Sequence, residues 1–525
     1  MVDPEASSMS DTEKRHALKE LEEAPLPSRV RSRTDSSITP NDQDEEKNDG
    51  QKEGDVEPQH ISVEDWNGPN DPENPHNWPL WLRMYHCVTP GLLGFAVTFG
   101  TSVYTPALSD IMNDFHVSRT AAIVPLTVYT LGLAFGPVVS APLSETYGRK
   151  IVYLISFAVF MLFTLGAGFS QSFAALIVCR FFAGFTGGPV LAVGGGTNAD
   201  VFPPRQRAIV TSVFLMSPFA GPALGPFIGG FAAQHKGWRW TQWCMLFISV
   251  FTYIIAIPMK ETYKKIILKR RAKELGMNPL DRTVTGASAV KSAFIQNFLR
   301  PLHMLVTEPI VFFLSLYTAF AFGVLFIFFA AFPYTFQRPP YNFTISQTGL
   351  TFLAIGLGVL IAGITGIFVD RKLYQHQFRQ ALERGESHAL PEHRLYSSMI
   401  GSFGLPIGLF WFAWSADRGC HWAVPVVAAI PFAWGNLCIF ISSALYIVDV
   451  YGPQNGASAV AANGIFRYTL GAVFPLFTIQ MYSGLGIGWA TSLLGFISVL
   501  MLPIPWVFYE WGPAIRKRSR YPVMM

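Results

Sequence analysis

Two arginines, Arg180 and Arg467, lie inside apolar stretches that are long enough to cross a bilayer. A charged side chain at that depth costs roughly 2.5 to 3.5 kcal/mol on insertion scales, so each is expected to face a partner or a wet cavity. The chemistry that such residues could perform is the handling of protons or of charged groups within a membrane. The alternatives are that Arg180 binds backbone carbonyls as a structural residue and that Arg467 extends to the membrane surface.

Glycine and proline are concentrated at residues 221–230, within an apolar stretch from Ala208 to Ala233. In a soluble helix each glycine would cost about 1 kcal/mol and each proline about 3, so we expect a helix only where neighbouring membrane helices accommodate it. Gly221, Gly225 and Gly229 recur every four residues and form one surface for close helix packing. That surface suits either tight packing or a bend that moves.

Patterns typical of enzymes are missing from the sequence. It contains no Walker A sequence, no Gly-x-Gly-x-x-Gly sequence after a strand and no zinc-type spacing of histidines. The five cysteines are scattered and lack metal or redox spacing. We therefore expect no enzymatic activity, no catalytic residue, no metal and no cofactor.

The elements that must position these residues are membrane spans. Half of the 525 residues are apolar and only 14% are charged. After about residue 85 the chain contains twelve apolar runs, each about 20 residues long, as a spanning helix requires. Their approximate centres are Phe95, Leu131, Phe160, Ala183, Phe219, Phe247, Phe320, Leu357, Leu405, Pro431, Leu470 and Phe496. The predicted fold is an all-α membrane protein with twelve transmembrane helices.

Basic residues are distributed unevenly between the connections of these spans. If the N-terminus is cytoplasmic, the cytoplasmic connections and the C-terminal tail hold 23 Lys and Arg residues, and the opposite loops hold five. Because basic loops favour the cytoplasmic side, both termini are predicted in the cytoplasm. The net charge of +4 reflects this topology, and we expect no nucleic-acid partner. Asn342 begins a glycosylation acceptor sequence on the predicted outer side.

The composition also predicts domain boundaries. The polar N-terminal segment is expected to be a disordered tail. Within it, Ser32, Thr34 and Ser36, beside Arg31 and Arg33, could be phosphorylated or simply solvated. A basic loop then separates two groups of six spans. The predicted parts are a cytoplasmic tail at 1–84, an N-terminal bundle at 85–260, an inter-bundle loop at 261–305, a C-terminal bundle at 306–510 and a short cytoplasmic tail at 511–525.

The connection after the second span of each half has a similar sequence, which suggests internal duplication. Residues 143–150 read LSETYGRK, and residues 366–372 read GIFVDRK, so an acid precedes bases in both. The first stretch resembles the signature Gly-x-Leu-x-Asp-x-x-Gly-Arg-Lys of the major facilitator superfamily. It departs from the signature at Ala141, which replaces the leading glycine, and at Glu145, which replaces the aspartate.

Three further stretches carry the resemblance toward the fungal twelve-span drug:proton antiporters. Residues 176–184 resemble the Arg-x-x-x-Gly motif of the superfamily, and residues 221–230 match its antiporter motif at every defined position. Residues 258–263, PMKETY, are similar to the Pro-Glu-Thr-Tyr run that follows the sixth span, with an insertion. The resemblance covers roughly residues 75–512 and implies two pseudo-symmetric six-helix bundles.

The resemblance also implies roles for individual residues. Proton coupling is assigned to Arg180 and Asp200. A conformational latch is assigned to Glu145, Gly148, Arg149 and Lys150, with Glu145 expected near Arg149 and near the start of the eleventh span. The antiporter motif consists of Gly221, Gly225, Pro226, Gly229 and Gly230. Candidate substrate contacts are Tyr129, Tyr317, Phe320, Asn436, Phe440, Asn463 and Arg467.

The expected function is proton-coupled antiport that exports amphipathic small molecules, such as antifungal drugs, toxins or secondary metabolites, by alternating access. The expected partners are the substrate, protons and the bilayer, with a monomer in the plasma membrane or, alternatively, the vacuolar membrane. Other hypotheses are proton-coupled uptake, a polyamine carrier and a membrane sensor that does not transport. No Asp or Glu lies well inside a predicted span, which disfavours polyvalent cations and leaves the proton-carrying residue unidentified.

Overall fold

The structure is a computed structural model that describes residues 65–203, 206–277, 295–386 and 389–523. It divides into two units, Met1–Asn74 and Pro75–Met525. In the described part of the first unit, the carboxylate of Asp71 accepts hydrogen bonds from the backbone nitrogens of Asn67 and Glu73, at 2.8 and 2.9 Å. Most of the predicted N-terminal tail, including Ser32, lies outside the described residues.

Six long helices form the first half of the second unit. They are α2 (Leu80–Ser102), α4 (Arg119–Tyr147), α5 (Arg149–Gly168), α6 (Phe173–Val201), α7 (Arg207–Lys236) and α8 (Arg239–Ala256). The short helix α3 (Leu108–Phe115) connects α2 to α4. Ser118 and Ser172 precede α4 and α6, and each accepts a backbone N–H bond of 3.2 Å, the interaction that makes serine a favourable N-cap. The first span, α2, begins at Leu80, five residues before the boundary at residue 85 that the sequence predicts.

The second half is divided less evenly, into several short helical segments and one that is very long. They are α12 (Pro309–Phe336), α13 (Ile345–Thr351), α14 (Leu353–Val369), α16 (Tyr396–Gly401), α17 (Gly404–Asp417), α18 (Ala423–Met501) and α19 (Ile504–Arg516). The backbone of α18 is non-helical at Gly452 and Gly486, with φ of 61° and 76°, which glycine adopts readily. A straight helix of 79 residues would be about four times as long as the hydrocarbon core is thick. These glycines therefore divide α18 into three spans.

The count of spans follows from these breaks. In the described residues, ten helices are long and apolar enough to cross a membrane. One of them, Asn455–Arg516, contains the break at Gly486 and provides two spans. Helix α8 provides another, because Phe247, Phe251 and Ile254 are exposed on its outer face as lipid contacts require. The twelve predicted spans are therefore present in the described part of the chain.

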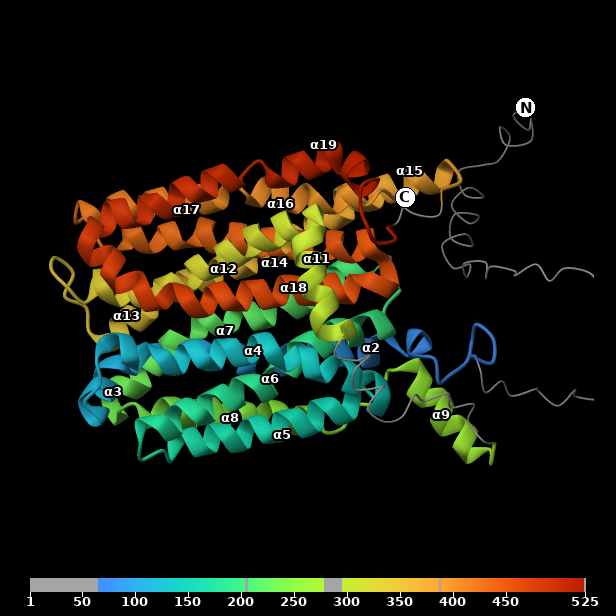
Figure 1. Ribbon diagram of the computed structural model, residues 1–525, viewed down its shortest axis with the longest axis horizontal. Coiled ribbons are helices and arrows are strands. Elements are labelled where there is room, and N and C mark those ends of the chain that lie inside the picture. Colours follow the sequence, from blue (N-terminus) through green and yellow to red (C-terminus); the bar gives the residue numbers. More distant parts are fainter. Residues whose placement is uncertain (1–64, 204–205, 278–294, 387–388, 524–525) are drawn as a thin grey trace, which may run out of the picture. The chain divides into compact units, whose positions relative to one another are not determined.

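The remaining helices lie at the ends of the spans. Figure 1 shows α9 (Lys264–Glu274), α15 (Gln375–Glu383) and the C-terminus at one end, and α3 and α13 at the other. We call the first of these the basic end, because most of the Lys and Arg residues outside the spans lie there. Helix α11 (Arg300–Thr307) leads into α12 from the predicted inter-bundle loop. Helix α19 extends to Arg516 and so includes the first residues of the predicted C-terminal tail.

The two halves contact each other along two sets of helices. Helix α4 packs against α18, where Thr127 Oγ1 donates a hydrogen bond of 3.0 Å to the carbonyl oxygen of Ala472. Helix α7 packs against α13 and α14 along its length. The glycine-rich run of α7 is therefore part of the boundary between the halves.

Candidate functional site

The glycines of α7 allow this helix to approach α2 closely. A methyl group built on Gly221 or Gly225 would overlap atoms of α2, and one built on Gly229 would overlap the backbone of Val103, which directly follows α2. Ser102 Oγ donates a hydrogen bond of 3.4 Å across this contact to the carbonyl oxygen of Gly221. The spacing of four residues thus forms the close helix contact that the sequence predicts.

The same run also contacts the second half of the molecule. A methyl group on Gly230 would lie 3.0 Å from the carbonyl oxygen of Ile345, the first residue of α13. One turn earlier, Pro226 lies against Gly349, and nearer the basic end Met216 lies against Gly363 of α14. Helix α7 is therefore packed between α2 of its own half and α13 and α14 of the other half.

Arg180 lies at the centre of the first half and is 1% exposed. Its Nη2 donates a hydrogen bond of 2.8 Å to the carbonyl oxygen of Gly100 in α2. Its guanidinium carbon lies 5.0 Å from the ring centre of Tyr104 and 4.5 Å from that of Tyr129. Arg180 forms no ion pair with any described residue, and its Nε lacks a hydrogen-bond partner there. The side chain therefore links α2, α4 and α6 and keeps an uncompensated positive charge.

Arg467 lies in the middle span of α18 and is 9% exposed. Its guanidinium carbon lies 4.8, 4.2 and 4.5 Å from the ring centres of Phe322, Phe440 and Tyr468. Within the described residues its Nε has no hydrogen-bond partner. Arg467 thus points inward among aromatic rings and does not extend to the membrane surface. One turn earlier on α18, Asn463 donates a hydrogen bond of 2.7 Å to Thr318.

A cavity of about 20 Å³ lies between the two halves beside Arg467. Its wall is formed by side chains from α2, α7, α12 and α18. They are Thr98, Thr101, Pro218, Phe219, Pro222, Phe322, Phe326, Arg467 and Tyr468. This volume is enough for about one water molecule, so a larger molecule requires the wall to open. Pro222 places the glycine-rich run of α7 in that wall.

Among the predicted substrate contacts, Arg467 is the one that lines this cavity. Phe440 is not part of the wall, but it contacts the wall residue Phe219, and their ring centres are 5.1 Å apart. Others serve packing between helices: Asn436 donates a hydrogen bond of 3.0 Å to Ala321, and Tyr129 donates one of 2.6 Å to Val97. Two further predicted contacts, Tyr317 and Phe320, are buried in α12 outside the cavity wall. The other residues of the wall were not predicted from the sequence as substrate contacts: Thr98, Thr101, Pro218, Phe219, Pro222, Phe322, Phe326 and Tyr468.

The basic end of the first half contains a charged cluster around Arg149. Arg149 Nε lies 3.1 Å from Asp200 Oδ2, and its Nη1 donates a hydrogen bond of 2.7 Å to Ser144. The predicted proximity of Arg149 and Asp200 is therefore present. The ring of Tyr263 covers the guanidinium at 4.8 Å. Burial, and to a smaller extent the negative charge of Glu145, raises the pKa of the Tyr263 hydroxyl. The hydroxyl therefore stays neutral.

A different acid from the predicted one completes this cluster. Glu145 is exposed and forms no ion pair in the part of the chain that the structure describes. Glu261 instead accepts hydrogen bonds from the backbone nitrogens of Arg149 and Lys150, at 2.9 and 3.1 Å. Gly148, with φ of 102°, leaves room for this carboxylate, which a Cβ atom would displace. Glu145 does not join Arg149 in this structure, because Asp200 and Ser144 bind the guanidinium and Glu261 binds the backbone at the start of α5. The expected contact of Glu145 with the eleventh span stays a prediction.

Glu261→Gln is expected to lower the melting temperature of the purified protein in detergent. The carboxylate binds the first turn of α5, where a negative charge and charged hydrogen bonds are favourable, so its loss should cost about 1 to 2 kcal/mol. The control is Glu274→Gln, which removes a carboxylate from an exposed pair with Arg270 and should change little. Equal melting temperatures for the two variants would contradict the role of Glu261.

The second half contains a more deeply buried counterpart of this cluster. Arg394 Nε lies 2.7 Å from Asp449 Oδ2, and its Nη1 lies 3.3 Å from Asp370 Oδ1. Arg371, which the repeated sequence predicts as the base, is exposed. The reason is that η5 (Asp370–Tyr374) and α15 are inserted before the arginine that enters the cluster. Beside it, Glu392 and Arg516 form a second buried pair at 3.0 Å.

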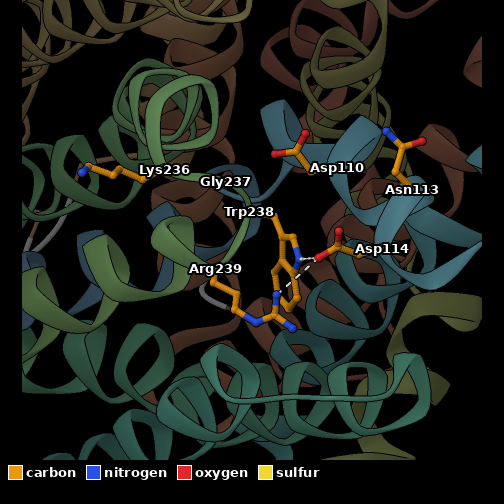
Figure 2. A pocket seen from close by; sticks show the side chains of 7 residues that line it. All are labelled: Asp110, Asn113, Asp114, Lys236, Gly237, Trp238 and Arg239. Atoms are coloured by element: carbon orange, nitrogen blue, oxygen red, sulfur yellow. Dashed lines mark hydrogen bonds and ion pairs between the residues drawn. The ribbon is translucent and has the colours of Figure 1, made fainter.

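A larger pocket, about 330 Å³, lies at the end opposite the basic end. Asp110, Asn113 and Asp114 of α3 line it, together with residues 236–239 between α7 and α8, as Figure 2 shows. Asp114 Oδ2 accepts a hydrogen bond of 2.7 Å from Trp238 and lies 3.3 Å from Arg239 Nη1. Because Asp114 binds Trp238 and Arg239, we assign the pocket a structural role in joining α3 to the start of α8. The predicted glycosylation residue Asn342 is exposed between α12 and α13.

Comparison with known proteins identifies relatives over most of the chain. The family model described as Major Facilitator Superfamily matches residues 91–475. Polyamine transporter 4 of Saccharomyces cerevisiae is 40% identical over 483 residues, which cover 87% of this chain and 73% of the relative. The Major facilitator superfamily multidrug transporter FLU1 of Candida albicans is 36% identical over 470 residues, 88% of this chain and 76% of the relative. Another fungal relative is described as an efflux pump.

A solved structure supports the fold independently of close sequence similarity. The proton:xylose symporter XylE aligns with a TM-score of 0.58 at 15% sequence identity. The alignment covers 82% of this chain and 97% of the symporter. The two chains therefore share a fold.

Proposed function

Since this chain belongs to the Major Facilitator Superfamily and is a multi-pass membrane transporter, we propose that it is a proton-coupled antiporter that exports amphipathic small molecules. The observation that carries the proposal is the position of α7. Its glycine-rich run lies against α2 on one side and against α13 on the other. A helix that contacts both halves through small residues suits a mechanism in which the halves rock about a central cavity. The multidrug and efflux relatives support export as the direction.

The energy of a proton gradient is sufficient for this exchange. One proton that enters down 100 mV and one pH unit releases about 3.7 kcal/mol. That free energy supports roughly a 500-fold gradient of a neutral solute, since each factor of ten requires about 1.4 kcal/mol. The proposed antiporter therefore needs no nucleotide or other cofactor.

The proposed orientation places the basic end in the cytoplasm, with the protein as a monomer in the plasma membrane. The helices α9 and α15 and the C-terminus lie at this end (Figure 1). Basic residues near span ends favour the cytoplasmic side, which supports this choice. Cysteine labelling of Lys265→Cys in α9 and Asn342→Cys at the other end, in intact cells, tests the orientation.

Arg180→Ala is expected to lower flux driven by a pH gradient by about tenfold or more, the effect of losing a buried charged hydrogen bond. The reason is that its buried side chain, which forms no ion pair with any described residue, links α2, α4 and α6 at the centre of the first half. The measurement is proton and substrate movement in proteoliposomes with an imposed pH gradient. Arg180→Lys keeps a positive charge at this position and controls for folding. Arg270→Ala removes a positive charge from a side chain that is 80% exposed and controls for the loss of a charge. Unchanged coupling in Arg180→Ala would remove this residue from the proposed mechanism.

Polyamine transport is a second candidate, favoured by the relative that is 40% identical. Radiolabelled spermidine in the same proteoliposomes separates it from the export of other molecules. A sensor would bind a ligand without moving it, and an uptake carrier would raise the intracellular concentration of its substrate. Reconstituted flux and the direction of accumulation in cells distinguish these alternatives from export.

A further inference from the structure

We propose that the central cavity, when its wall opens, binds an organic anion with a flat apolar body and that Arg467 binds its negative charge. The inference rests on the proposed transport function and adds the chemical class of the substrate. It is carried by three features of the cavity: the state of the arginine, the rings around it and the absence of acids from its wall.

The first feature is an arginine without a counter-charge. Arg467 is 91% buried, lines the cavity and has an Nε without a hydrogen-bond partner among the described residues. It also forms no ion pair in the described chain. A buried charge is strongly unfavourable unless it is paired, and aromatic faces compensate for only part of this cost. A carboxylate or another planar anion would supply two hydrogen bonds and the missing charge.

The second feature is the aromatic wall beside the guanidinium. Phe322 packs against Phe326 and Tyr468, with ring centres 4.8 and 5.4 Å apart. The ring centre of Phe219, from the other half, lies 5.1 Å from that of Phe440 and 6.2 Å from that of Phe322. Such rings bind flat apolar groups by offset or edge-to-face contacts. The wall therefore suits an aromatic ring that carries the anion.

The third feature is the sign of the charges near the cavity. None of the described residues that line it is acidic, and Arg467 lies among them. Arg180 on α6 adds a second cation that has no ion-pair partner in the described ranges. Its side chain contacts α2 and α4, which pack against α7 and α18. A potential of one sign attracts ligands of the opposite charge and repels those of the same charge. This arrangement is suited to anions and unsuited to polyamines, despite the similarity to a polyamine transporter.

Three probes with the same ring system test the inference: 1-naphthoate, 1-naphthamide and 1-naphthylmethylammonium, which are anionic, neutral and cationic. Their binding to the purified full-length protein in detergent is measured by equilibrium dialysis. We expect naphthoate to bind at least about tenfold more tightly than the amide, as a charged hydrogen bond provides, and the cation to bind most weakly. Equal affinities, tighter binding of the cation, or no binding of any probe would overturn the inference.

Variants connect the preference to the guanidinium. Arg467→Gln should lower the ratio of naphthoate to naphthamide affinity to near one, whereas Arg467→Lys should retain part of it because the charge remains. Arg418→Gln, an exposed residue at the end opposite the basic end, is the matched control and should keep the parental ratio. An unchanged ratio in Arg467→Gln would show that Arg467 only joins the helices through its aromatic contacts.

Flux measurements separate this inference from the proposed function. Selective naphthoate binding without proton-driven flux in proteoliposomes would support the anion site and refute antiport. Proton-driven flux of the amide or the cation, without a preference for naphthoate, would support antiport and refute the anion site.

Discussion

Gly225→Leu is expected to lower substrate flux by about 100-fold or more, which corresponds to roughly 2.7 kcal/mol in a rate-limiting step. An atom at the Cβ position would overlap Ser102 Oγ and lie 2.9 Å from the backbone nitrogen of Val103. Because this backbone atom at the end of α2 cannot move aside as a flexible side chain can, α7 must separate from α2. Overpacking of this kind costs about 1 to 3 kcal/mol or more. The separation would also disturb the contact of α7 with α13.

The experiment compares flux per molecule in proteoliposomes that contain equal amounts of folded protein. Gly225→Ala should give an intermediate loss, because its methyl group makes the overlap without the rest of the leucine side chain. Gly195→Leu in α6 is the matched control. Apart from the neighbouring backbone of its own helix, no described atom lies within 4 Å of the position of its Cβ, so flux should stay within about twofold of the parent. Parental flux in Gly225→Leu would contradict a mechanism that depends on close packing of α2 and α7.

The sequence predicted the fold well because the bilayer imposes simple requirements. Spans must be about 20 residues long and apolar, which identified all twelve, and glycines four residues apart must lie on one helix face. The weak points were the ends of helices. Leu80 begins α2 before the chain becomes uniformly apolar, and Gly486 breaks α18 although the surrounding residues form a continuous apolar stretch.

The site was harder to predict because its contacts join residues that are distant in the sequence. Glu261 binds the backbone of Arg149, 112 positions earlier, and no local pattern shows this. The aromatic wall of the cavity could not be separated from packing residues, since the chain contains 44 phenylalanines and Phe322 has no neighbouring signal. Arg467 was identifiable because a charge in an apolar run is rare, and its orientation toward the cavity came from the structure.

The two charged clusters differ in burial, and this difference should appear in stability. Arg394 and Asp370 are 5% and 4% exposed, whereas Arg149 and Asp200 are 13% and 20% exposed. Removing one partner from a fully buried pair costs about 3 to 5 kcal/mol, because the remaining charge is left without compensation. In the second half, Arg394 is bound to two acids, so its removal leaves the neighbouring carboxylates of Asp370 and Asp449 without this shared cation.

Arg394→Met is therefore expected to lower the melting temperature in detergent by more than Arg149→Met does, and to reduce the yield of folded protein. Adding Asp370→Asn and Asp449→Asn to Arg394→Met should restore part of the stability, because these changes remove the uncompensated charges while keeping the side-chain volume. This rescue distinguishes an electrostatic cost from the loss of arginine packing, which the asparagines would not repair. Equal destabilisation by the two arginine variants, or a triple variant less stable than Arg394→Met, would contradict the argument from burial.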